Sequence, residues 1–219
     1  YIGRKYYLPL LSSIAGRAIW LQGCSLLDVE CEGVQNVPFG VYAEASVASS
    51  YPNLLDNKVF LHYVAQCNQA AFLMLADNDA CVMQGNEFFA NFATGNQRTV
   101  YYFAGTASPS WDGNLFDIKA IDPNVAFSNI VEAIAGAPVT ALIFKCETWL
   151  GGVPSTGNWI VGAFNGSYFK MRPVADPISW GQWEITGTGN RFEVDFGWDD
   201  ARTPIDVTTT ANDRANFNS

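Results

Sequence analysis

Histidine is nearly missing from this chain, since His62 is the only one among 219 residues. Imidazole is the side chain best suited to act as an acid, a base or a metal ligand near neutral pH, so nucleophilic triads and most zinc sites need it. His62 itself lies in the apolar run from Val59 to Val64, where we expect a core or interface histidine. The sequence also has no phosphate loop, dinucleotide fingerprint or nucleophile elbow. We therefore predict no catalytic residue, no metal site and no cofactor.

Charge is also scarce, and it is unbalanced. Charged residues make up 15% of the chain, compared with about 25% in soluble domains. The chain has twelve Lys and Arg and 21 Asp and Glu, which gives a net charge of −9. This negative charge argues against direct contact with nucleic acid through the folded body. No apolar run reaches the roughly 18 residues of a membrane span, and the stretch from Val139 to Leu150 is too short. We expect an exterior that is neutral or covered by partners, and no membrane contact.

Cysteine is too sparse to predict a disulfide framework. The five cysteines are an odd number at wide spacings in a long chain. We expect buried free thiols at Cys24, Cys31, Cys67, Cys81 and Cys146.

Aromatic residues are abundant, at 14% of the chain, and β-branched runs recur between Gly, Asn, Asp and Pro. This pattern is typical of many short strands. We predict a mainly β fold, an antiparallel β-sandwich or jelly roll, and no internal repeat of solenoid length is visible. The expected strands are 17–23, 39–47, 59–66, 70–76, 99–105, 115–121, 139–149, 159–164, 181–186 and 191–198.

The last two of these runs predict a C-terminal hairpin, because a turn segment from Thr186 to Asn190 separates them. In the second run Phe192 and Val194 alternate with Glu193 and Asp195, as in a strand with one buried and one wet face. One short helix is expected near 124–135, with a start signal at Asp122-Pro123-Asn124. The predicted organisation is an N-terminal arm at 1–16, a single β-domain at 17–199, and a C-terminal arm or tail at 200–219.

Three carboxylates alternate at Asp28, Glu30 and Glu32, so a strand there would place them on one face, with Val29 and Cys31 on the other. Such a pattern indicates a hydrated strand face, and a calcium site is the alternative because calcium accepts clustered oxygens.

Tryptophans and carboxylates near the C-terminus are the remaining candidates for binding. A sugar-binding module or glycosidase would use aromatic platforms beside carboxylates, and a retaining glycosidase needs two carboxyls about 5 Å apart. Trp111 lies in a turn-rich loop and is expected to be an exposed contact. The candidate sugar or interface contacts are Trp111, Trp180, Trp183, Trp198, Glu193 and Asp195, with Glu184 as a further carboxylate.

The leading hypothesis is a structural protein of a large assembly, a capsid or tail component of a virus or phage. Its partners would be copies of itself or sibling structural proteins, and its location the virion. The alternative is a secreted, extracellular carbohydrate-binding module or β-sandwich glycosidase, with a glycan as partner. An adhesin or receptor-binding tip would combine the two.

Overall fold

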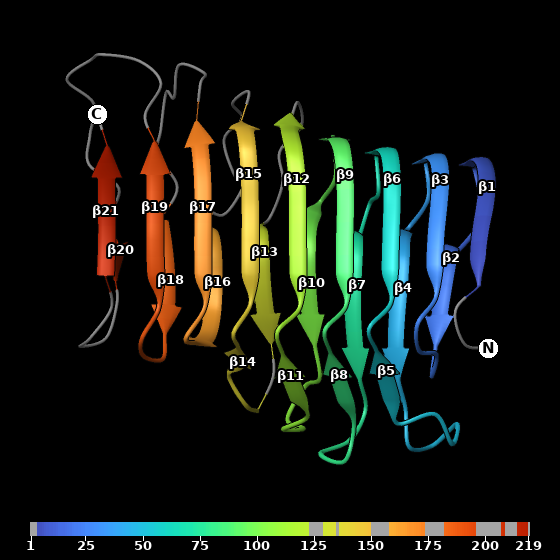
Figure 1. Cartoon of the computed structure of the whole chain (residues 1–219), viewed down its shortest axis with the longest axis horizontal. Helices are drawn as coiled ribbons and strands as arrows, with labels where there is room; N and C mark the ends of the chain where they lie inside the picture. The colour runs from blue at the N-terminus through green and yellow to red at the C-terminus, as the bar shows by residue number, and fades with distance from the viewer. Residues whose placement is uncertain are drawn as a thin grey trace.

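A computed structural model describes residues 4–122, 129–134, 136–149, 158–173, 182–195, 207–208 and 214–218. Across these residues every regular element is a β-strand, and the strands pair side by side in parallel. The fold is a parallel β-solenoid, in which the chain coils and adds one strand to each wall in turn (Figure 1). The expected antiparallel β-sandwich or jelly roll is therefore wrong, although the mainly β composition is right.

The first sheet contains nine described strands, ordered as they occur along the chain, so β1 and β21 lie at opposite ends of the stack (Figure 1). Its strands are β1 (Lys5–Ser12), β3 (Asp28–Gln35), β6 (Lys58–Ala65), β9 (Glu87–Thr94), β12 (Leu115–Asp122), β15 (Ile143–Trp149), β17 (Tyr168–Pro173), β19 (Arg191–Asp195) and β21 (Arg214–Asn218).

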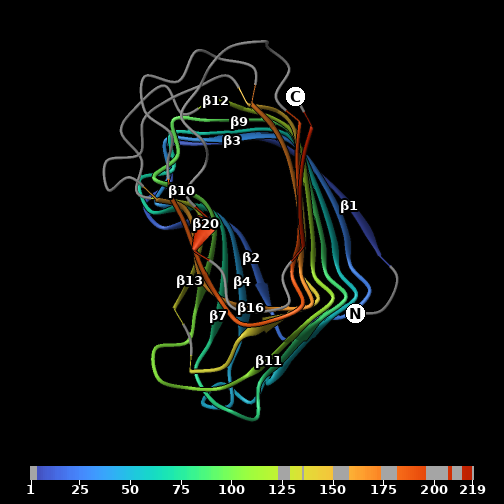
Figure 2. The ribbon, with the colours of Figure 1, turned by 90° about the vertical axis from the view of Figure 1, so that its left-hand side faces the viewer.

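The second sheet faces the first across the core, as the end-on view in Figure 2 makes clear. Its main wall consists of β2 (Arg17–Gln22), β4 (Phe39–Ala45), β7 (Ala70–Ala76), β10 (Arg98–Phe103), β13 (Asn129–Ile134), β16 (Asn158–Asn165), β18 (Gln182–Thr186) and β20 (Val207–Thr208). A short third side branches from β16 through β14 (Val139–Thr140), β11 (Ser110–Asp112), β8 (Val82–Gln84) and β5 (Asn53–Leu55).

The core consists of like residues stacked from coil to coil. In the first sheet each inward side chain lies beside the inward side chain of the next strand, as register requires. Phe88 and Phe116 stack with ring centroids 4.8 Å apart, and Phe169 and Phe192 stack at 5.5 Å. The buried column runs through Val29, Val59, Phe88, Phe116, Phe144, Phe169 and Phe192.

A ladder of buried asparagines marks one corner of the solenoid. Asn57 Nδ2 donates to Asn86 Oδ1 at 2.9 Å, and Asn86 Nδ2 donates to Asn114 Oδ1 at 3.0 Å. The three residues recur 29 residues apart (57 to 86) and 28 apart (86 to 114). This is the solenoid repeat that inspection of the sequence missed, and Phe88, Phe116 and Phe144 of the buried column recur with the same spacing of 28 residues.

The expected helix near 124–135 is wrong where the structure describes it. Residues 129–134 form β13, and Val131 lies between Val100 and Ile160 of the neighbouring strands. A parallel strand buried within a solenoid is rich in apolar residues on successive positions, so its pattern resembles that of a short buried helix. Residues 124–128 and 135 lie outside the described part.

The predicted C-terminal hairpin is also wrong, although both of its strands exist. β18 pairs with β16 and β20, while β19 pairs with β17 and β21, so the two never pair with each other. Gly187 (φ 110°) and Gly189 (φ 74°) adopt left-handed conformations that turn the chain from one sheet into the other. The turn is a corner of the coil and does not reverse the chain into its own sheet.

The expected terminal arms contribute strands to the sheets. β1 lies within residues 1–16 and pairs along its length with β3. β20 and β21 lie within residues 200–219 and pair with β18 and β19. Backbone that is hydrogen-bonded in this way belongs to the solenoid, so the expectation of extended arms is wrong for these segments.

Candidate functional surfaces

Trp111 is buried, so the expectation of an exposed contact is wrong. Its side chain is 1% exposed, and its ring packs edge-on against Tyr102 with centroids 5.2 Å apart. The turn-rich segment around it holds β11, whose central residue points into the core.

The other predicted tryptophans and carboxylates are divided between two sheets. Trp183 lies in β18, while Glu193 and Asp195 lie in β19. Trp180 and Trp198 lie outside the described residues, as do the side chains of Trp183 and Asp195. Glu184 is exposed on β18, so it points outward from the second sheet, and Glu193 points outward from the first. The structure therefore does not bring Glu184 and Glu193 together as a catalytic pair.

Glu193 lies on the outer face of β19, as the alternation with buried Phe192 and Val194 predicted. Lys170 Nζ lies 2.9 Å from its Oε1, and the Tyr168 hydroxyl donates to its Oε2 at 2.7 Å. The hydrogen bond from Lys170, followed by that from Tyr168, holds the pKa of Glu193 below its ordinary value.

The predicted hydrated face of Asp28, Glu30 and Glu32 is present on β3, with Val29 and Cys31 buried on the other side. Lys5 Nζ lies 3.4 Å from Glu30 and 3.9 Å from Asp28. His62 Nε2 lies 3.7 Å from Glu30, and its side chain is 51% exposed, so His62 is not a core histidine. The alternative of an interface histidine stays a prediction. Within the described ranges, no group of three or more His, Cys, Asp or Glu side chains is arranged to hold a metal ion.

All five cysteines are free, and four are buried as expected, whereas Cys24 is half-buried. Burial raises the pKa of the Cys24 thiol to about 11 and that of Cys67 to about 12. The raised pKa disfavours the thiolate, which is the reactive form, at Cys24 and Cys67. Among the residues that the structure describes, no helix is long and apolar enough to cross a membrane.

The outer surface of the second sheet carries rows of aromatic and aliphatic side chains. Parallel register aligns Trp20, Tyr42, Leu73 and Tyr101 in one row. It aligns Leu75, Phe103 and Ile134 in a neighbouring row. Trp20 is 51% exposed, Ile134 43% and Phe103 38%, whereas Tyr42 and Leu73 are buried among their neighbours in a small apolar cluster. We call these residues, together with Phe39, the aromatic face.

Polar groups on the same strands are held in fixed positions beside these rings. The Arg17 guanidinium lies 3.9 Å from the centroid of the Tyr42 ring and 4.4 Å from that of Trp20. Trp20 Nε1 donates to Glu44 at 3.0 Å. Arg98 pairs with Glu132 and lies over the Tyr101 ring at 4.6 Å. Each charge on this face is thus engaged with a ring or with an opposite charge.

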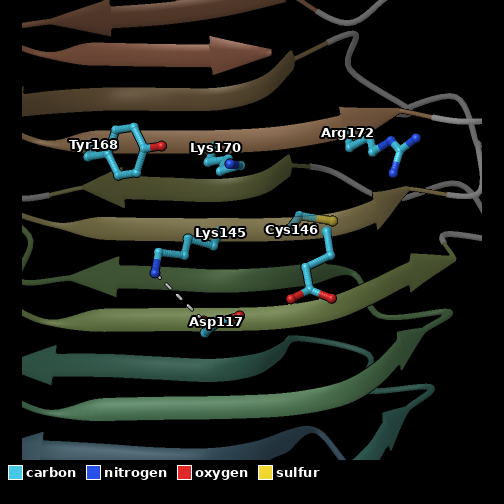
Figure 3. A pocket seen from close by; sticks show the side chains of 7 residues that line it. Asp117, Lys145, Cys146, Tyr168, Lys170 and Arg172 are labelled. Atoms are coloured by element: carbon cyan, nitrogen blue, oxygen red, sulfur yellow. Dashed lines mark ion pairs between the residues drawn. The ribbon is translucent and has the colours of Figure 1, made fainter. Parts of the chain in front are cut away.

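The outer surface of the first sheet is charged instead, and it contains a hollow of about 650 Å³ on β12, β15 and β17 (Figure 3). We call this the charged hollow. Lys145 Nζ lies 3.9 Å from Asp117 at one side of it. The lining residues are Asp117, Lys145, Cys146, Glu147, Tyr168, Lys170 and Arg172.

Sequence reasoning missed both surfaces, because their members lie in strands one coil apart and become neighbours only through parallel register. Comparison with family models, curated proteins and solved structures finds no match. The two surfaces are therefore the basis for inferring function.

Proposed function

We propose that the protein is a structural component of a large assembly, such as a capsid or tail component of a virus or phage, that acts through contacts between subunits. The observation that carries this proposal is the aromatic face. Exposed apolar residues scattered singly are ordinary. Here Trp20, Phe103 and Ile134 are exposed beside a packed apolar cluster on the same outer face, which holds Tyr42, Leu73 and Tyr101, and an apolar surface of this extent indicates an interaction surface. Aromatic residues and Arg are also the types enriched in the centres of interfaces.

The partner that best fits this face is a second copy of the chain. Outward-facing Arg17 and Arg98 balance Glu44 and Glu132, so β2, β4, β7, β10 and β13 present no net charge there. The whole chain carries −9, and acidic surfaces of two copies repel each other. The neutral aromatic face is where two copies can approach without that repulsion.

The area of the aromatic face is also consistent with an interface between two copies. Five strands spaced by about 4.8 Å, each about 20 Å long, present about 500 Å² before the relief of side chains is counted. A stable interface buries about 800 Å² on each partner. The aromatic face is large enough to form the centre of such an interface, with a rim supplied by the flanking strands.

The test is the mass of the native particle, measured by light scattering after size exclusion. We expect the wild type to exceed the 23.9 kDa of one chain and Phe103→Glu to shift it towards the monomer, because a carboxylate would be buried in the interface. Ile143→Glu is the matched control. Ile143 is 37% exposed, close to the 38% of Phe103, but lies on the first sheet.

A wild type that stays monomeric at high protein concentration would refute the proposal. An oligomer that Phe103→Glu and Ile143→Glu weaken equally would show that assembly uses another surface. Circular dichroism of both variants checks that each remains folded.

A further inference from the structure

The charges on the first sheet follow a rule over its N-terminal strands. Lys5, Asp28, Lys58 and Glu87 are register partners on four successive strands, and their signs alternate. Opposite charges side by side attract, and like charges directly opposite destabilise a sheet. Lys58 Nζ accordingly lies 3.7 Å from Glu87. Each charged side chain in this row therefore lies beside one of opposite sign.

At the charged hollow the signs of neighbouring charges no longer alternate. There the row reads Asp117, Lys145, Lys170 and Glu193, so two lysines are direct register partners on β15 and β17. Lys145 pairs with Asp117 on one side, and Lys170 pairs with Glu193 on the other. The acids therefore lie at the two outer ends of the row, and none lies between the lysines.

A third cation extends this pair. Arg172 lies two residues beyond Lys170 on the same outer face of β17, and it lines the same hollow (Figure 3). The lining carries three positive and two negative side chains, and Glu193, which pairs with Lys170, lies at its rim. The Tyr168 hydroxyl donates to Glu193, which holds this carboxylate at the rim.

We propose that the charged hollow binds an oxyanion, a carboxylate, sulfate or phosphate group, between Lys145 and Lys170. A negative group at that position can receive a charge-assisted hydrogen bond from each of the two lysines. Arg172 adds a planar fork of donors that matches the geometry of such a group. The proposal does not depend on the aromatic face, which lies on the opposite sheet.

Two sources can supply this chemistry, the acidic sugars of a glycan and free phosphate. The experiment is isothermal titration of the full chain at low ionic strength with trigalacturonate and, separately, with inorganic phosphate. We expect saturable binding that weakens as salt is added, because exposed charges are screened. Tighter binding of trigalacturonate identifies an acidic glycan as the ligand class, and tighter binding of phosphate identifies a free anion. Both outcomes support the site.

Variants locate the binding. We expect Lys145→Met and Lys170→Met each to weaken it at least tenfold. Lys58→Met is the matched control, because Lys58 also lies on the outer face of the first sheet, with a side chain 52% exposed beside 40% for Lys145 and 49% for Lys170. No saturable binding of either probe, or an equal loss in all three variants, would overturn the proposal. Absence of anion binding would not bear on the proposed subunit contact, because that contact uses the second sheet.

Discussion

At the scale of single residues, the asparagine ladder holds the corner of the coils in place. The Asn86 side chain accepts from the backbone N–H and Nδ2 of Asn57 and donates to the Leu54 carbonyl at 2.9 Å. It is fully buried, so water cannot replace any of these bonds. Asn57 and Asn114 make the equivalent bonds to the Cys24 and Met83 carbonyls. An amide suits this place because it both donates and accepts.

We predict that Asn86→Ala lowers the free energy of unfolding by about 3 kcal/mol or more, because each buried group that loses its partner costs about 1–3 kcal/mol. Urea denaturation followed by circular dichroism measures the change. Asn53→Ala, at an exposed position on β5, is the control and should change stability by no more than about 0.5 kcal/mol. Equal effects of the two substitutions would contradict a structural role for the ladder.

At the scale of elements, neighbouring strands of the first sheet are coupled through their outer side chains. Glu193 on β19 contacts Tyr168 and Lys170 on β17, and Arg191 Nη2 lies 3.6 Å from it. These contacts favour the ionised carboxylate, so they lower its pKa in the folded state. At a pH above the ordinary pKa of glutamate these contacts therefore stabilise the folded state. The stabilisation is lost as the pH falls through the lowered pKa of Glu193.

We predict that carboxyl titration followed by NMR places the pKa of Glu193 below its ordinary 4.5. Lys170→Met should move it back towards that value, because Lys170 is the largest cause of the shift. Lys58→Met, on a distant strand, should leave it in place. A Glu193 pKa that does not change in Lys170→Met would show that the ion pair does not form in solution.

At the scale of the whole molecule, the solenoid is quasi-one-dimensional, because each strand packs mainly against the coil before and the coil after. Among the described strands, β1 pairs only with β3 and β2 only with β4. β6 and β7 each have a neighbour on both sides. In this chain the free energy of local opening is then expected to vary along the axis and to be lowest for strands with one described neighbour, such as β1 and β2.

We predict that amide hydrogen exchange is fastest in β1 and β2 and at least tenfold slower in β6, β7, β9 and β10. Mass spectrometry of peptic fragments after timed labelling measures this difference. Protection that is uniform from β1 to β10 would indicate instead that the coils open only together, as one cooperative unit.

The sequence by itself determined the local features of this protein. β-branched and aromatic runs bounded by Gly, Asn and Asp predicted about half of the 21 described strands, including those at 17–23 and 115–121, which the structure places at Arg17–Gln22 and Leu115–Asp122. β9 and β17 were not among the expected strands. Alternation predicted which sides of β3 and β19 are buried. These predictions succeed because propensity and the two-residue period depend only on neighbours in the chain.

Only the tertiary structure decided which strands lie side by side. The direction of pairing depends on whether a turn reverses the chain or carries it round a corner, as at Gly187 and Gly189, and residue types alone favoured a hairpin there. Parallel register then joined Trp20 to Tyr42 and Lys145 to Lys170, residues 22 and 25 positions apart. It also buried Trp111 and exposed His62. Both proposed surfaces exist because each coil places its strand beside the equivalent strand of the coil before, so residues far apart in the sequence become neighbours. No local sequence pattern encodes this pairing.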